Sequence, residues 1–290
     1  MAITFAPRLA FAGFDRSTSP KWQMVPVNGT RVLTISGAGG LVPRVRVVSG
    51  NASALTAVQT TARGTTTLTL TGGTAPGRAF VEWVPSLTDA GPVQTGFTLE
   101  VSVKDEKKIS TAFHYVDDSR RQVTRRRIVD LNAMITAAND ILTPQSNVTI
   151  ERKSAAPLPI TQDLGRVVRF SSHLTGAPDN VPIAQHEWDD VVAHADTTAD
   201  FNVFFVREYE QDNTPLVDGQ AAGTIAAEKN CIFEDRTGNP AAEVLAHETM
   251  HLLGISGHSA NRRHLNASGA VRTSHLITRD QANTINASGT

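Results

Sequence analysis

The N-terminal third of the chain is a series of short β-prone runs divided by turn-forming residues. Runs rich in β-branched and aromatic residues recur at intervals of roughly 8–12 residues, the spacing typical of all-β sandwiches. Pairs such as Asn28-Gly29 and Gly72-Gly73 stand between the runs and tolerate the backbone angles of tight turns. The pattern predicts strands over residues 31–36, 44–48, 65–70, 78–84 and 97–104.

The clearest of these strands covers residues 97–104. Apolar residues fill its odd-numbered positions and polar residues fill its even-numbered positions, which is a period of two. This period predicts one face in a core and the other face in water. Because no helical period appears in this region, we expect an all-β, Ig-like sandwich over residues 1–105, without residues suited to chemistry.

After the polar run at 105–108 the pattern changes to a mixture of strands and helices. Apolar residues spaced three and four apart predict an amphipathic helix that begins at Ile128 and stops before Pro144. Predicted strands at 109–116 and 148–150 flank this helix and suggest a βαβ unit. Further predicted strands cover 201–206, 223–227 and 231–233. We therefore expect a second domain of α+β class over residues 106–290.

The residues best suited to chemistry lie in a helix predicted to begin at Asn239-Pro240, an N-cap residue followed by a favoured first helical residue. His247 and His251 are four residues apart and therefore project from one helix face, at the spacing that lets two imidazoles bind one zinc ion. Glu248 lies beside them, where it can accept a proton from an attacking water. Chance would produce this HExxH pattern on the order of 0.01 times in such a chain.

A zinc site that keeps a position for water needs a third protein ligand. The chain has no glutamate after Glu248, which leaves the candidates His258, His264, His275 and Asp280. Gly254 can adopt a positive φ and end the helix, so that the chain turns back toward the metal. His258 is the nearest candidate after this turn, and His264 is its main alternative.

The segment from His247 to His258 resembles the metzincin zinc-binding consensus H-E-x-x-H-x-x-G-x-x-H, with one residue inserted after Gly254. A looser resemblance to the matrixin-like branch covers residues 106–290, at 139–142, 148–150, 199–206 and 277–285. Metzincins place a methionine in a tight turn under the metal. No methionine follows Met250 in this chain, and Leu265 is expected to supply the apolar floor instead.

This resemblance implies a zinc endopeptidase in which Zn²⁺ is held by His247, His251 and His258 and Glu248 is the general base. The implied fold is a twisted mixed sheet with helices, including the zinc helix and a C-terminal helix. Protein or peptide substrate would lie along an edge strand at 219–227. Two alternatives stay open: a non-catalytic binding protein whose metzincin-like domain is stabilised by metal, and a zinc amidase acting on cell-wall peptides.

Composition narrows the partners and the location. A net charge of -1 gives no field that would attract nucleic acid, and no apolar run is long enough to span a membrane. Cys231 is the only cysteine, so no internal disulfide can form. No standard signal peptide or propeptide is seen. Since an active protease would then threaten the cell that makes it, we expect a bacterial effector that is secreted or delivered to a target cell, with an immunity or delivery partner. We also expect a monomer.

Overall fold

The structure is a computed structural model of the 290-residue chain, and it divides into two compact units. Unit 1 comprises Met1–Lys107, Leu142–Val148 and Leu276–Ala287, and unit 2 comprises Lys108–Ile141, Thr149–His275 and Ser288–Thr290. Unit 1 thus includes two segments from the part of the sequence assigned to the second domain. The described residues are 2–9, 11–88, 91, 93, 95–121, 124, 128–165, 168–170, 187–211, 222–235, 241–268 and 272–287.

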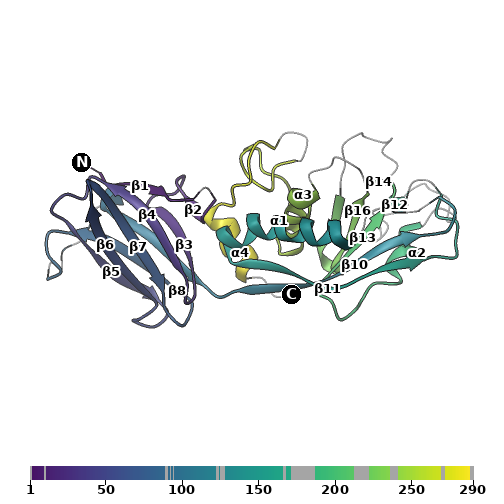
Figure 1. The fold of residues 1–290 in the computed structure, drawn as a ribbon, viewed down its shortest axis with the longest axis horizontal. Helices are drawn as coiled ribbons and strands as arrows, with labels where there is room; N and C mark the ends of the chain where they lie inside the picture. Colours follow the sequence, from purple (N-terminus) through teal and green to yellow (C-terminus); the bar gives the residue numbers. More distant parts are fainter. Residues whose placement is uncertain are drawn as a thin grey trace. The chain divides into compact units, whose positions relative to one another are not determined.

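Unit 1 contains two sheets with one apolar core between them (Figure 1). Core residues come from both sheets, for example Leu33 and Leu70 from one and Val81 and Val101 from the other. The predicted strands all form, and the part is β-rich as expected. One sheet has the order β1 (Thr4–Pro7), β4 (Thr30–Ser36), β7 (Thr65–Gly72), β6 (Leu55–Ala62). The other has the order β2 (Phe14–Asp15), β3 (Lys21–Pro26), β9 (Thr98–Lys104), β8 (Gly77–Val84), β5 (Val42–Ser49).

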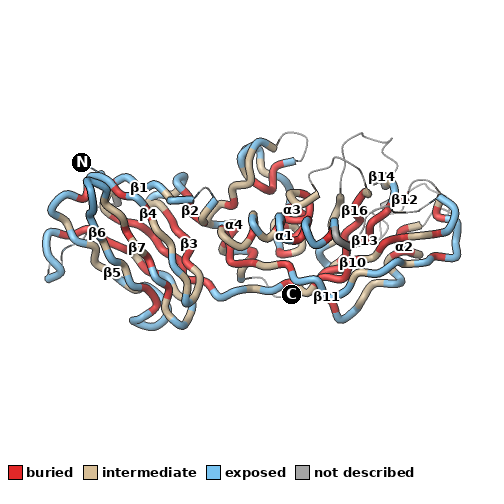
Figure 2. The backbone as a smooth tube through the Cα atoms, in the orientation of Figure 1, coloured by how far each residue is buried: buried red, intermediate tan, exposed pale blue. Residues whose placement is uncertain are grey.

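Strand β9 corrects one expectation, because both of its faces are buried. The buried positions of the chain are red in Figure 2. The face predicted to lie in water carries Glu100, Ser102 and Lys104, and none of these residues is more than 8% exposed. Ser102 accepts a hydrogen bond from the indole nitrogen of the buried Trp22. Alternation correctly identified the two faces of the strand, but it carries no information on what covers the second face.

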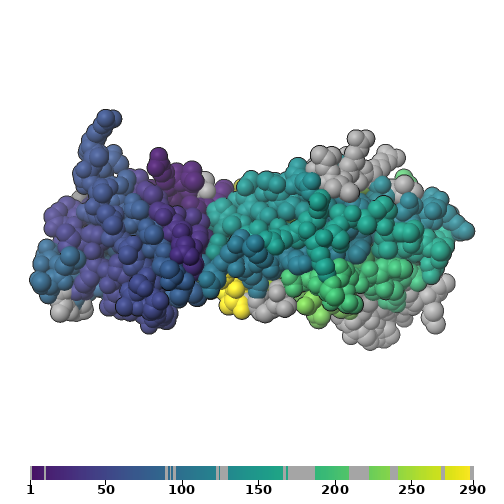
Figure 3. Space-filling view, turned by 60° about the horizontal axis from the view of Figure 1, so that its bottom comes forward, coloured from purple at the N-terminus to yellow at the C-terminus, as the bar shows by residue number. Residues whose placement is uncertain are grey.

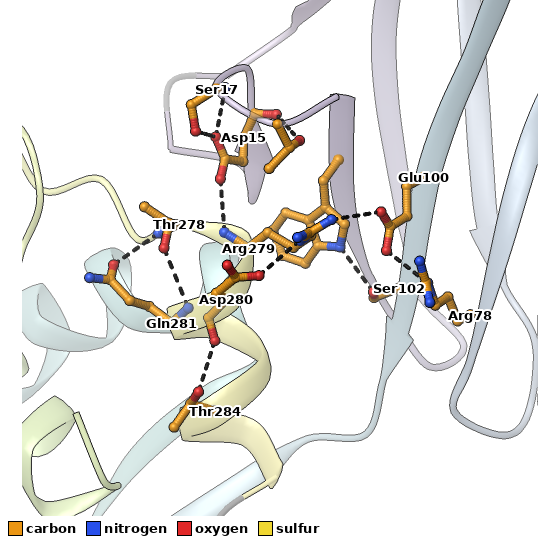
Figure 4. Close-up of polar contacts among 12 residues, drawn as sticks. Asp15, Ser17, Arg78, Glu100, Ser102, Thr278, Arg279, Asp280, Gln281 and Thr284 are labelled. Atoms are coloured by element: carbon orange, nitrogen blue, oxygen red, sulfur yellow. Dashed lines mark hydrogen bonds and ion pairs between the residues drawn. The ribbon is translucent and has the colours of Figure 1, made fainter. Parts of the chain in front are cut away.

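The C-terminal helix α4 (Arg279–Ala287) contributes to this cover (Figure 4). The side chain of Arg279 donates to Glu100 Oε2 at 3.0 Å, while Arg78 donates to the other oxygen of the same carboxylate at 2.8 Å. The backbone N–H of Arg279 donates to Asp15 Oδ2 at 2.9 Å. The space-filling view shows yellow atoms of the C-terminal segment beside blue atoms of the strands (Figure 3). Helix α4 is therefore fixed to the sandwich by charged, part-buried contacts.

Unit 2 is built on a five-stranded mixed sheet. Its order is β11 (Val148–Pro159), β10 (Lys107–Asp117), β13 (Phe201–Val206), β16 (Asn230–Glu234), β15 (Ala222–Ile225). β10, β13 and β16 run parallel, and the edge strand β15 pairs antiparallel with β16. β12 (Val168–Phe170) and β14 (Tyr209–Gln211) form a small parallel sheet, and α2 (Glu187–Val192) places Trp188 edge-on against Phe204. The continuous apolar run predicted as a strand is β13, which is buried throughout as that run implies.

Helix α1 (Ile128–Ser146) forms where the apolar period predicted it, but it continues past Pro144. The proline lies in the last turn, two residues before the helix ends, so the backbone hydrogen bond that its missing N–H removes is among the last of the helix. The Pro144 carbonyl accepts from Arg31, and the N–H of Asn147 donates to the Thr143 carbonyl. Asn147 then ends the helix with a φ of +57°.

Among the described residues, none of the helices combines the length and apolar character that a membrane crossing requires.

Candidate metal centre

The predicted HExxH helix is α3 (Ala241–Leu252). It contains no proline or glycine, and residues 244–250 are all buried, which ties the helix into unit 2. The acidic Glu243 lies in its first turn, where it interacts favourably with the helix dipole. The expected N-cap pair, Asn239-Pro240, lies outside the described residues.

Gly254 ends the helix as expected, with a φ of +92°. The N–H of Gly254 donates to the His251 carbonyl and the N–H of Ile255 donates to the Met250 carbonyl, which is the hydrogen-bond pattern of a Schellman motif. Gly257 also has a positive φ, +65°. Two left-handed glycines therefore turn the chain between the helix and His258, which accommodates the residue inserted after Gly254.

The structure brings three histidines together. His247 Nε2 lies 3.0 Å from His251 Nε2 and 3.2 Å from His258 Nε2. One ligand atom from each ring falls within 4.8 Å of the others. Three nitrogens bound to one tetrahedral zinc at about 2.05 Å would lie about 3.3 Å apart, so the observed spacing is close to that of a zinc site.

Hydrogen bonds from the other side of two rings set which nitrogen faces the centre. His247 Nδ1 lies 2.8 Å from the Leu265 carbonyl, and His251 Nδ1 lies 2.7 Å from the Ile255 carbonyl. A carbonyl only accepts, so each Nδ1 carries the proton and each Nε2 keeps its lone pair. Backbone carbonyls commonly orient metal-bound histidines in this way. The donor set therefore fits a divalent metal such as zinc.

Electrostatics keeps these rings neutral at pH 7. Burial lowers the pKa of His247 to about 3, with further lowering from His251, Arg272 and His258, while the hydrogen bond to Leu265 opposes the shift. Burial likewise lowers the pKa of His251 and of His258. A neutral imidazole is the form that binds metal.

Glu248 is 5% exposed and lies beside the histidines on α3. Burial raises its pKa to about 7, opposed by a hydrogen bond from Thr224 and by the charge of Arg272. A carboxyl group with a pKa near neutrality can both take up and release a proton. Cys231 is buried nearby, and desolvation raises the pKa of its thiol.

Arg272 connects helix α3 to the loop that follows it. It donates to the Ala267 carbonyl at 3.2 Å and to the Glu243 carbonyl at 3.4 Å, and its Nη2 lies 3.1 Å from His247 Nδ1. The Nδ1 proton is directed at Leu265, so the Ala267 carbonyl is the better partner for this guanidinium. Leu265 itself is fully buried, and its backbone carbonyl accepts the hydrogen bond of His247.

The other candidates for the third ligand have hydrogen-bond or ion-pair partners outside the cluster of His247, His251 and His258. His264 Nδ1 lies 2.8 Å from Ser259 Oγ and its Nε2 lies 3.0 Å from Asn261 Nδ2. His275 Nε2 lies 2.8 Å from Glu243 Oε1. Asp280 belongs to unit 1, where it pairs with a neighbouring arginine. Only His258 of the four candidates joins the cluster of potential ligands found among the described residues.

Sequence reasoning missed Thr224, Arg272 and the two carbonyl acceptors. Threonine is abundant in this chain, and nothing in the position of Thr224 marks it as a neighbour of Glu248. Backbone carbonyls have no residue signature at all. The part of the expected substrate strand at 219–221 lies outside the described residues, and the rest of that segment includes β15.

Comparison with known proteins gives no family. No protein-family model matches the sequence, and no curated protein matches it either. Solved structures resemble part of the chain: domains 6–7 of the surface layer protein SbsC, at 14% identity and a TM-score of 0.23, cover 39% of it. A chimeric titin Z1Z2 carrying a decorin peptide covers 37%, at 20% identity and a TM-score of 0.18. The chain spans 53% of the surface layer structure and 97% of the titin chimera. Similarity at this level carries no argument about function.

Proposed function

We propose that this protein is a zinc-dependent endopeptidase with a metzincin-like catalytic domain. The observation that supports it best is the convergence of three histidine Nε2 atoms beside a buried glutamate. A purely structural zinc site is closed by four protein ligands and has no use for a general base. Three ligands with an adjacent carboxyl group are typical of hydrolytic sites.

In the proposed reaction, the three histidines and Glu248 have different roles. His247, His251 and His258 would hold the ion, which, when bound, supplies Lewis-acid polarisation of the scissile carbonyl and lowers the pKa of water. Glu248 takes one proton from the attacking water as the water oxygen bonds to the carbonyl carbon. The same carboxyl group then gives the proton to the leaving amine as the C–N bond breaks.

The edge of the sheet offers a place for the substrate chain. Among the strands that the structure describes, β15 pairs with β16 alone, and α3 packs against it. An extended peptide can add to such an edge through main-chain hydrogen bonds. We therefore infer that substrate peptides pair with β15 and cross the histidine cluster.

Further proposals concern where the protein acts, its oligomeric state and its partners. We propose that the protein works as a monomer outside the producing cell, secreted or delivered to a target cell, with a delivery or immunity partner. An active protease without restraint would damage the cell that makes it. Recovery of the active protein from the producer's cytosol in quantity would contradict this inference.

Digestion of casein by wild type and by Glu248→Gln, with the bound zinc of each quantified, tests the proposal. We expect both proteins to hold about one zinc per chain and only the wild type to cut. Glu151→Gln is the matched control, because Glu151 is an exposed residue that pairs with Lys108 at the surface. If wild type holds zinc but cuts neither casein nor cell-wall peptides, the protein is a binding module. Cleavage of cell-wall peptides alone would favour an amidase.

A further inference from the structure

The catalytic helix and the edge strand are joined by a side-chain hydrogen bond. Thr224, on β15, donates its hydroxyl proton to Glu248 Oε2 at 2.7 Å. The two residues are 24 positions apart and lie on different elements. Because Glu248 is buried, the hydrogen bond forms away from bulk water, where bonds to charged groups are strong.

This hydrogen bond engages only one of the two carboxylate oxygens. Among the described residues, no protein group donates a hydrogen bond to Glu248 Oε1. The carboxyl group is planar, so fixing Oε2 also fixes the direction in which Oε1 points. A general base must lie within about 2.6–3.2 Å of the proton that it accepts, so its orientation decides whether it functions.

The position of Thr224 is restricted by the sheet and by its own side chain. Thr224 lies opposite Cys231 in the antiparallel ladder between β15 and β16. Its β-branched side chain has few rotamers, which restricts the hydroxyl further. The strand therefore presents the hydroxyl to Glu248 from a fixed direction.

The other nearby charged group does not replace this contact. Arg272 acts on Glu248 through its charge, but its guanidinium donates to the carbonyls of Ala267 and Glu243. A side chain engaged in this way holds the loop and helix together and leaves the orientation of Glu248 to the threonine.

We propose that Thr224 is a positioning residue that holds Glu248 Oε2 so that Oε1 faces the attacking water. The inference rests on the proposed peptidase function for its chemical meaning, but the positioning itself is a property of the protein alone. It also links substrate binding to catalysis, because the strand proposed to pair with the peptide carries the hydroxyl that orients the base.

Two substitutions separate this role from a structural one. Thr224→Val keeps the shape and the β-branched character but removes the hydroxyl, whereas Thr224→Ser keeps the hydroxyl. We expect the valine variant to lose at least about tenfold in kcat with little change in KM, and the serine variant to keep most of the activity. Thr60→Val, at an exposed hydroxyl pair on β6, is the matched control.

Two further measurements do not depend on activity. Zinc content should be unchanged in Thr224→Val, since no ligand is altered, whereas the melting temperature should fall somewhat because the buried Glu248 loses its hydroxyl donor. Crystal structures of the metal-free wild type and valine variant should show the Glu248 carboxylate displaced in the variant only. The proposal is overturned if the carboxylate keeps its place and kcat is retained, or if the valine variant loses zinc along with activity. Should the wild type cut nothing, the peptidase function fails, and the crystallographic comparison alone still decides the positioning.

Discussion

Replacing Lys104 by methionine should stabilise the protein at neutral pH. Lys104 lies on the face of β9 that is buried in unit 1, and it is 8% exposed. Burial lowers the pKa of its amine from the ordinary 10.5 to about 8. Methionine keeps an unbranched apolar stem of similar length and removes the charge, so it fills the space without the cost of a buried ammonium.

The size and the pH dependence of the effect follow from this shift. The fall from 10.5 to about 8 corresponds to roughly 3 kcal/mol, since each pKa unit is worth about 1.36 kcal/mol. The folded-state pKa is lower than the unfolded-state pKa, so the unfolded chain binds the extra proton between these values and wild-type stability rises with pH there. The cost of Lys104 is complete below about pH 8 and gone above about pH 10.5.

Urea unfolding of both proteins, followed by tryptophan fluorescence from pH 7 to pH 11, measures this difference. Trp22 and Trp83, two of the three tryptophans, belong to unit 1. The advantage of Lys104→Met should be roughly 3 kcal/mol at pH 7 and should shrink by about 1.4 kcal/mol per pH unit above pH 8. Lys108→Met is the control, because Lys108 is exposed and forms a surface ion pair worth little. An advantage that is absent at pH 7, or constant across the range, would refute the reasoning.

Two other substitutions test the site and the fold. His258→Ala should weaken zinc binding by at least roughly 100-fold, as measured by competition with a chelating dye, because it removes a ligand rather than a supporting group. His264→Ala should leave zinc affinity unchanged, and the reverse pattern would reassign the third ligand. Arg279→Met should lower the free energy of unfolding by about 2 kcal/mol in urea titrations, since the buried Glu100 loses one charged donor and keeps only Arg78. Unchanged stability would show that the ion pair between Arg279 and Glu100 does not help to hold α4.

The features predicted correctly from sequence are those with a local cause. The spacing of His247 and His251 depends only on helix geometry, which repeats every few residues. The end of α3 depends on Gly254, because glycine adopts a positive φ without strain. The strands of unit 1 could be predicted because turn residues and β-prone runs alternate along the chain. The metal itself and the peptidase activity stay predictions.

Tertiary structure decided the features whose partners are distant in the sequence. The polar face of β9 is buried because α4, nearly two hundred residues away in the chain, supplies Arg279 to Glu100. Of the two alternatives, only His258 joins the cluster of potential ligands among the described residues, while His264 has hydrogen bonds with Ser259 and Asn261. Thr224 meets Glu248 because the antiparallel edge strand lies beside α3. The sequence by itself determined periodic local structure and the candidate HExxH residues, because both depend on residues within a few positions of each other. Long-range packing decides which polar groups are buried together, and a local sequence pattern contains no information on such contacts.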